Sequence, residues 1–144
     1  MLVSHILKSK ADDSVVTALP STTISEAAQM LSERRIGTLL VSRDGRKPDG
    51  ILSERDIVRQ LGSAGAACLT EPVSSIMTSK LVTCTRDIRA DIVLEQMTEG
   101  RFRHMPVVED GALVGLISLG DVVKARLMEL AMEKDALEGM IRGH

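Results

Sequence analysis

Aromatic residues are almost absent from this sequence of 144 residues, which contains one phenylalanine, Phe102, and no tryptophan or tyrosine. The hydrophobic core must therefore be built from aliphatic side chains, and aliphatic side chains and backbone would have to hold any flat ligand. Cysteine is also scarce, because Cys68 and Cys84 are the only two. They lack metal-site spacing and are too few for a disulfide framework, so we expect free thiols in a reducing compartment and no metal.

Long apolar runs and an excess of one charge are missing as well. No stretch approaches the roughly 18 apolar residues of a transmembrane helix, and the N-terminal stretch lacks the pattern of a secretory signal. The formal net charge is −2, whereas binding to nucleic acid or to a membrane would need clustered cations. Together with 44% hydrophobic and 26% charged residues, these absences predict a soluble, cytoplasmic, globular protein.

Signatures of catalysis are missing too. The sequence contains no Gly-x-Gly-x-x-Gly pattern, no P-loop, no zinc-ligand spacing and no nucleophile elbow. Its three histidines are scattered, and Cys84 in a predicted strand is better explained as a small core residue than as a nucleophile. We therefore expect that the chain is not an enzyme.

The sequence does contain a repeat. The phrase GILSERD at 50–56 returns as GLISLGD at 115–121, an offset of 65 residues (115 − 50) that keeps the glycine, the serine and the aspartate in place. The stretches 16–45 and 82–111 also match, since each begins with Val-Thr and ends in an acidic residue followed by glycine. This self-similarity indicates a duplicated structural unit. One copy alone is marginal for an independent core, so we expect the two to pack together with pseudo-twofold symmetry.

Local patterns predict the order β-α-β-β-α in each copy, and hence an α+β fold. In copy one, apolar residues at helical spacing follow a capping box of Thr23 and Glu26. We predict strands at 15–17, 38–41 and from 51, with helices at 24–35 and from Ser53 to about 62. In copy two we predict strands at 82–84, 105–108 and 113–117, with helices at 88–99 and from Ser118 to about Arg142. The predicted boundaries are 1–66 for the first repeat, 67–75 for a connector, and 76–144 for the second repeat with its long C-terminal helix.

The repeated Gly-x-x-Ser-x-x-Asp phrase has a structural and a functional interpretation. A serine at a helix start, with an acid three residues later, is the arrangement of a common helix cap. The same helix start presents backbone N–H groups that suit an anion, and the aspartate can accept hydrogen bonds from the vicinal hydroxyls of a ribose. The residues alone do not choose between these interpretations.

The doubled phrase, the order of elements and the flanking stretches RRIGTLLV and RHMPVVEDG resemble tandem cystathionine-β-synthase (CBS) domains, together called a Bateman module. The resemblance covers roughly residues 10–132, and the chain looks like a stand-alone bacterial module without an attached enzyme. It implies clefts between the paired copies that bind adenine-bearing ligands, AMP first, with ADP, ATP, NAD(H) or S-adenosylmethionine as alternatives. It also implies a regulatory role in signal transduction and frequent dimerisation.

The resemblance further implies particular binding residues. The family's aspartate holds the ribose, which points to Asp56 and Asp121, with Ser53 and Ser118 beside them. The residues expected at the adenine lie on or next to predicted strands: Thr17, Thr83, Thr38, Leu39, Leu40, Met105, Pro106 and Val107. Phosphates are expected at Arg55, Arg103 and His104.

The two copies differ where these cations lie. Arg55 corresponds to Gly120 in copy two, and the pair Arg103 and His104 was matched by position to Ile36 and Gly37 in copy one. We therefore expect two clefts that are not equivalent.

The predicted C-terminal helix has an apolar side formed by Val123, Leu127, Leu130, Ala131, Leu137 and Ile141. This side is larger than a small domain needs, so we expect it to pack on a second chain in a homodimer. The alternative is that it folds back on its own domain.

Three functions remain open at the level of sequence. The favoured one is a stand-alone sensor of adenine nucleotides that acts on an unknown regulated protein. The others are an interaction scaffold with empty clefts and, less favoured, a small nucleotide-hydrolysing enzyme. Ligand binding separates the first from the second, and turnover of bound ATP would identify the third.

Overall fold

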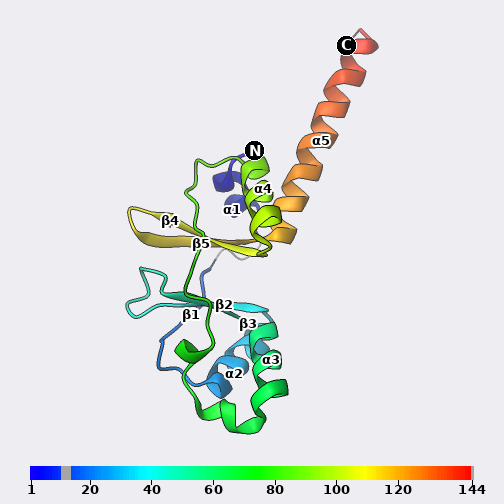
Figure 1. Cartoon of the computed structure of the whole chain (residues 1–144). Helices are drawn as coiled ribbons and strands as arrows, with labels where there is room; N and C mark the ends of the chain where they lie inside the picture. The colour runs from blue at the N-terminus through cyan, green and yellow to red at the C-terminus, as the bar shows by residue number, and fades with distance from the viewer. Residues whose placement is uncertain (11–13, 144) are drawn as a thin grey trace. The chain divides into compact units, whose positions relative to one another are not determined.

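The computed structural model describes residues 1–10 and 14–143, which form two compact units (Figure 1). The Asp56 unit contains residues 14–82 and 109–114, and the Asp121 unit contains residues 1–10, 83–108 and 115–143. Among the described residues there are five α-helices, none of which combines the length and the apolar character needed to cross a membrane. The mixed helix-and-strand fold and the long C-terminal helix are confirmed, whereas the pseudo-twofold packing of the copies stays a prediction.

The Asp56 unit is a three-stranded sheet packed against two helices. Strands β1 (Thr17–Ala18), β2 (Thr38–Val41) and β3 (Gly50–Ser53) lie in that order, with β1 parallel and β3 antiparallel to β2. Helices α2 (Ile24–Arg34) and α3 (Glu54–Ala64) lie close to predicted bounds, and Thr23 and Glu26 form the predicted capping box. The core of the unit contains Ala18, Ile24, Ala27, Leu31, Leu39, Val41, Leu52 and Ile57.

The segment predicted as a connector is part of this core. It contains two short 3-10 helices, η1 (Ala66–Thr70) and η2 (Val73–Ser75), and the side chains of Cys68 and Val73 are fully buried. Thr78 also pairs with Ile51 of β3 through two backbone hydrogen bonds of 2.9 Å. The buried side chains of Cys68 and Val73, together with this pairing, therefore attach the segment to the Asp56 unit.

The Asp121 unit contains three helices and most of a β-hairpin. They are α1 (Val3–Ser9), α4 (Ala90–Gly100) and α5 (Leu119–Ile141), with strands β4 (His104–Glu109) and β5 (Ala112–Ser118). Asp110 and Gly111, both at positive φ (51° and 78°), join the strands as in a two-residue hairpin turn. The strand predicted at 82–84 is reduced to a single bridge between Cys84 and Val107, and α1 is a helix that the sequence patterns did not predict.

The N-terminal segment belongs with the elements of copy two, which differs from the grouping of residues 1–66 expected from the sequence. The backbone N–H groups of Val3 and Ser4 donate to the carbonyls of Ile88 and Arg86, each at 2.9 Å. Ala90 at the start of α4 donates in turn to the carbonyl of Met1. These bonds, with the buried side chains of α1, tie the segment to α4 and α5.

The glycine of the repeated phrase permits a close approach in both copies. A Cβ on Gly50 would lie 2.4 Å from Sδ of Met77, and a Cβ on Gly115 would lie 2.6 Å from Cδ2 of Leu7. Such distances are well inside van der Waals contact. In each copy the glycine therefore allows a segment from elsewhere in the chain to pack directly on the strand.

Candidate functional site

Both copies of the phrase form a helix cap. In copy one the hydroxyl of Ser53 accepts a hydrogen bond from the backbone N–H of Asp56 (3.2 Å), and Oδ2 of Asp56 accepts from the N–H of Ser53 (2.9 Å). In copy two the corresponding distances between Ser118 and Asp121 are 3.1 and 2.9 Å. The structural interpretation of the phrase is thus correct, and it fixes where each aspartate points, which any ligand role also requires.

Asp121 has a second partner that the sequence analysis missed. The ammonium of Lys10, just after α1, lies 3.0 Å from Oδ2 of Asp121 and 2.8 Å from the carbonyl of Leu116. Burial by itself would raise the pKa of Asp121, but the N–H of Ser118 and the Lys10 ammonium outweigh it, so this pKa lies below its ordinary value of 3.8. The carboxylate is therefore ionised at neutral pH, and its Oδ1 accepts no hydrogen bond from the described residues.

Two of the predicted phosphate residues lie near Asp121. The backbone carbonyl of Arg103 accepts a hydrogen bond of 2.7 Å from the N–H of Leu119, the first residue of α5. Burial is the main reason why the pKa of His104 lies below its ordinary value. The Asp121 carboxylate raises this pKa in part, and the charges of Lys10 and Arg103 lower it further. His104 is thus a neutral imidazole at neutral pH, and the positive charge of this group is carried by Arg103 and Lys10 rather than by His104.

The Asp56 phrase has a weaker charge environment. Among the described residues, Asp56 forms an ion pair only with Arg59, one turn along α3, at 3.5 Å, and the Arg59 side chain is 77% exposed. The predicted phosphate residue Arg55 is also exposed, and its side chain makes no ion pair with a described residue. An exposed pair of this kind contributes little to stability, although the Asp56 side chain itself is 18% exposed, against 25% for Asp121.

The strand pleat divides the predicted adenine residues of copy one. Thr17 pairs with Leu40 and Thr38 pairs with Ser53, which places these four residues on one face of the sheet. Leu39 lies on the opposite face, and its side chain is buried in the core between sheet and helices. Only the backbone of Leu39 therefore remains a candidate for ligand contact.

In copy two the predicted adenine residues lie on β4 and beside it. Met105, Pro106 and Val107 are buried, and the backbone of Pro106 accepts a hydrogen bond of 3.0 Å from the N–H of Cys84. Thr83, directly before Cys84, is exposed. Their contact with a ligand stays a prediction.

The structure corrects the alignment of the cations between the copies. Helices α2 and α4 end at Arg35 and Arg101, both in the left-handed conformation (φ 53° and 56°). The first residues of α3 and α5 then donate to the carbonyls of Gly37 and Arg103. Arg103 therefore corresponds to Gly37 and His104 to Thr38, one position later than the sequence comparison placed them, because the offset before the strands is 66 residues (103 − 37) rather than 67 (103 − 36).

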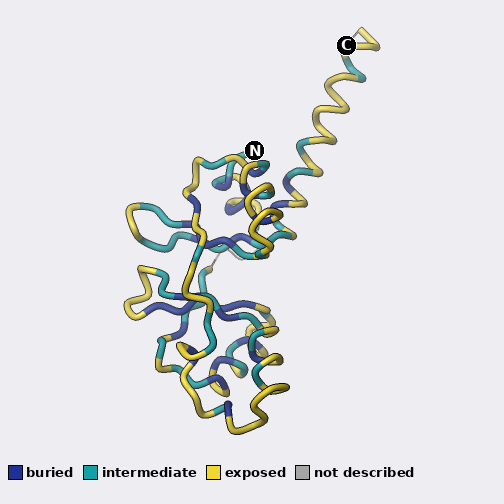
Figure 2. The backbone as a smooth tube through the Cα atoms, in the orientation of Figure 1, coloured by how far each residue is buried: buried dark blue, intermediate teal, exposed yellow. Residues whose placement is uncertain are grey.

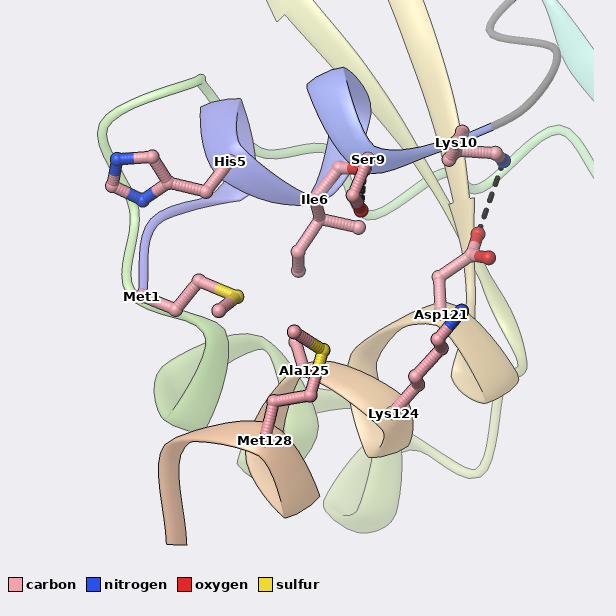
Figure 3. Close-up of a pocket in the computed structure, with 9 residues that line it drawn as sticks. All are labelled: Met1, His5, Ile6, Ser9, Lys10, Asp121, Lys124, Ala125 and Met128. Carbon is pink, nitrogen blue, oxygen red and sulfur yellow. Dashed lines mark hydrogen bonds and ion pairs between the residues drawn. The ribbon is translucent and has the colours of Figure 1, made fainter. Parts of the chain in front are cut away.

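A cavity of about 420 Å³ lies beside Asp121 in the Asp121 unit (Figure 3). Its walls come from α1 and from the first turns of α5, and it is lined by Met1, His5, Ile6, Ser9, Lys10, Asp121, Lys124, Ala125 and Met128. Among the nine, only Asp121 was predicted. A sequence signal for Lys10 did exist, because VSHILKSK at 3–10 returns as VSSIMTSK at 73–80, which makes Lys80 its counterpart in copy one.

Comparison with known proteins identifies the family. A model of the CBS domain matches residues 3–63 and 73–128, so the chain belongs to the CBS-domain family and carries two such domains. The two matches begin at Val3 and Val73, the first residues of the VSHILKSK and VSSIMTSK segments. The resemblance inferred from the sequence is thereby confirmed.

Relatives and solved structures agree with this assignment. A mitochondrial CBS domain-containing protein of Arabidopsis thaliana is 32% identical over 98% of this chain and 72% of its own length. Larger Arabidopsis proteins with CBS domains are 33% identical, but this chain spans only 22% of their length. A CBS-domain containing protein from Agrobacterium tumefaciens shares 45% identity and a TM-score of 0.81 over 88% of this chain and 99% of that chain.

A CBS domain protein from Pyrobaculum aerophilum, solved in complex with AMP, is 29% identical with a TM-score of 0.78 over 92% of this chain and 99% of that chain. These relatives belong to a typically regulatory, non-catalytic family, and the matches indicate no enzyme family. Within the described residues, no cluster of three or more His, Cys, Asp or Glu side chains could hold a metal ion.

Proposed function

We propose that the chain is a regulatory module that binds an adenine nucleotide, with AMP as the first candidate. The observation that carries the proposal is the Asp121 carboxylate, which is held in place by Ser118 and Lys10 while its Oδ1 accepts no hydrogen bond from the described residues. The AMP complex of the Pyrobaculum aerophilum protein supports the ligand class. ATP, ADP, NAD(H) and S-adenosylmethionine are the alternatives, and a related CBS pair is known in complex with S-adenosyl-L-methionine and 5′-methylthioadenosine.

The aspartates are proposed to hold the ribose in each site. An ionised carboxylate accepts stronger hydrogen bonds than a neutral group, and both aspartates are oriented by their caps, with Ser53 or Ser118 alongside. Thr17, Thr38, Leu40 and the residues of β4 are proposed to contact the adenine, and Arg55, Arg103 and His104 are the candidates for phosphate contacts that follow from the sequence resemblance. His104 would act as a neutral hydrogen-bonding group, because its burial lowers its pKa.

As a sensor, the module must convert binding into a change that a partner can detect. A ligand does this only if it binds two arrangements of the protein with different affinity. The regulated partner is unknown. Both cysteines are buried and neither forms a disulfide, which fits a reducing compartment such as the cytoplasm.

The decisive experiment uses the fact that the protein itself absorbs very little ultraviolet light at 280 nm. Since there is no tryptophan or tyrosine, ultraviolet absorbance near 260 nm and mass spectrometry of heat-released material detect any co-purified adenine ligand directly. Added AMP at about 100 times its Kd should stabilise the fold by about 2.7 kcal/mol, a melting shift of several degrees. Absence of binding by every candidate nucleotide would favour the scaffold, and steady turnover of ATP would favour the hydrolase.

The variants Asp121→Asn and Asp56→Asn assign the sites. The side-chain oxygen of asparagine can still accept the hydrogen bond from the serine N–H but the charge is removed, and a hydrogen bond to a charged group is worth about 1.5–3 kcal/mol. Each variant should weaken AMP binding to its own site about tenfold or more in calorimetry. Unchanged isotherms in both variants, with folding intact, would remove the aspartates from the site.

We also propose that the chain forms a homodimer through α5. Figure 2 shows the far half of this helix exposed, and the six apolar residues predicted to pack on a second chain are all exposed, with Leu127 at 62% and Leu137 at 61%. Steps of four and three residues link Val123, Leu127, Leu130, Lys134, Leu137 and Ile141. This is the heptad spacing of a two-helix seam. We define Val123, Leu127, Leu130, Lys134, Leu137 and Ile141 as the α5 seam.

Charge favours an antiparallel pair of seams. In a parallel pair, Lys134 would face Lys134 of the second copy across the seam. In an antiparallel pair centred near residue 132, Lys134 faces Leu130 instead, Leu127 faces Leu137 and Val123 faces Ile141. The ammonium of Lys134 can then reach solvent along the apolar surface.

The oligomeric state tests the seam. Leu137→Glu should convert the dimer to monomer in light scattering, whereas Met132→Glu should not, because Met132 is similarly exposed but lies on the other side of α5. For orientation, a mixture of Val123→Cys and Ile141→Cys chains should cross-link, while Ile141→Cys alone should not, since its two copies would lie about 27 Å apart. A monomeric wild-type protein would contradict the proposal.

A further inference from the structure

The cavity between α1 and α5 has an excess of positive charge. It contains the ammonium groups of Lys10 and Lys124 and the carboxylate of Asp121. Lys10 is engaged by Asp121 at 3.0 Å, whereas the exposed Lys124 side chain forms no ion pair with a described residue. In Figure 3, Lys10 approaches Asp121 from the α1 side and Lys124 extends from the next turn of α5. The lining side chains therefore carry two positive charges and one negative charge, which leaves one net positive charge for a ligand to neutralise. The Met1 ammonium, which also lines the cavity, is paired with Glu129 at 3.1 Å.

Polar and apolar groups in the cavity are arranged on different walls. Ser9 and His5 of α1 add polar side chains to the lining, Ser9 beside Lys10 and His5 at the opposite end beside Met1 (Figure 3), and the Nδ1 of His5 accepts a hydrogen bond of 2.9 Å from the N–H of Leu2. Ile6 and Ala125 are buried and form the apolar floor. The volume of about 420 Å³ lies within the usual range for small-molecule sites.

Asp56, the corresponding aspartate of copy one, has different charged neighbours. Lys80, the counterpart of Lys10, is exposed, and its side chain makes no hydrogen bond or ion pair with a described residue. Asp56 is paired with Arg59 of its own helix instead. The two copies therefore share the aspartate and the lysine in sequence, but only copy two brings them into contact.

We propose that the α1–α5 cavity binds the phosphoryl group of a nucleotide whose ribose is held by Asp121, and that Lys10 and Lys124 select nucleotides over nucleosides at this site. This inference rests on the proposed function. A phosphoryl group carries the negative charge that the cavity lacks, and ammonium groups are common phosphate partners. Lys10 would lie close to both the phosphoryl group and the ribose, because it contacts the Asp121 carboxylate that is proposed to hold the ribose.

Calorimetry of AMP and adenosine on the full-length chain tests the inference. Wild type should bind AMP at least tenfold more tightly than adenosine at the Asp121 site, identified by its loss in Asp121→Asn. Lys124→Met should reduce this preference several-fold and leave adenosine affinity nearly unchanged. Lys10→Met should weaken the binding of both ligands, AMP more than adenosine, because Lys10 also holds the Asp121 carboxylate. Lys80→Met is the matched control and should keep the wild-type ratio at this site. Phosphorus NMR of bound AMP provides a second readout, since its line should move in the Lys124→Met variant even if Lys10→Met folds poorly.

The outcomes separate this inference from the proposed function. Equal affinity for AMP and adenosine in wild type would overturn the phosphoryl site and leave adenine binding intact. A preference that survives both lysine variants but disappears in Arg103→Ala would also overturn it, by placing the phosphate at β4. If neither AMP nor adenosine binds, the proposed function fails and the inference fails with it.

Discussion

The two copies of Gly-x-x-Ser-x-x-Asp have nearly the same local geometry and different surroundings. Backbone N–H groups lie 2.9 Å from the aspartate oxygen in both caps. Asp56 then meets an exposed arginine one turn away, whereas Asp121 meets a lysine that is 111 residues distant in the chain. The comparison shows that the phrase determines the cap, while the segment packed against it determines which charged side chains surround the aspartate.

The packed segments are themselves repeated. Residues 3–10 lie against copy two and residues 73–80 against copy one, and the side chain that meets the glycine is Leu7 in one case and Met77 in the other. The helices in these two segments differ in length, since α1 has seven residues and η2 has three. The longer helix carries Lys10 to Asp121.

The largest expected effect comes from filling the space above each glycine. Gly50→Ala and Gly115→Ala should both destabilise by about 1–3 kcal/mol, as overpacking does. Gly50→Ala should cost more, because its Cβ also lies 3.1 Å from the Thr78 backbone oxygen, which is fixed by pairing with Ile51, whereas Leu7 can rotate its methyl groups away.

Denaturant unfolding measures these free energies. Gly62→Ala in α3 is the control, since a Cβ there meets nothing within 4 Å and should stabilise the helix by about 0.5–1 kcal/mol. Equal stability of Gly50→Ala and wild type would show that the segment 77–78 does not pack on β3 as described.

A smaller effect is expected from pH. The pKa of Asp121 is lowered in the folded chain, so its ionised form adds stability at pH values above 3.8, and this stability is lost as the pH falls below that ordinary value. Lys10→Met should reduce this acid sensitivity, while Lys80→Met should leave it unchanged. Unfolding free energies from neutral to acid pH provide the measurement, and identical profiles for the two lysine variants would mean that the Lys10–Asp121 pair does not form in solution.

Much of the fold could be predicted from local patterns. The bounds of β2 at 38–41 match the structure, α2 differs by one residue at its end, and α5 ends at Ile141, one residue before the predicted Arg142. These elements have strong periodicity or explicit caps, which act within a few residues. The strand at 82–84 was overestimated because a β-rich triplet carries no information about whether a partner strand continues beside it.

The candidate site was predictable only in part. Ser118 and Asp121 followed from a motif, but Lys10 is distant in sequence and lies in a segment that the repeat analysis had not aligned. Leu39 illustrates the opposite error, since it was grouped with its neighbours although alternate residues of a strand point to opposite faces. A one-residue change in loop length likewise moved Arg103 into correspondence with Gly37.

The family, the duplicated units, the two capped aspartates and the aliphatic composition of the core could be read from the sequence, because each depends on composition or on residues close together in the chain. Tertiary structure alone decided that residues 1–10 join copy two, that Lys10 rather than Lys80 reaches an aspartate, and that the α5 seam is exposed. Ion pairs and burial depend on which segments meet in space, and their energies change steeply with distances of a few ångströms. Two copies of one motif can therefore form equal caps and still have unequal surroundings.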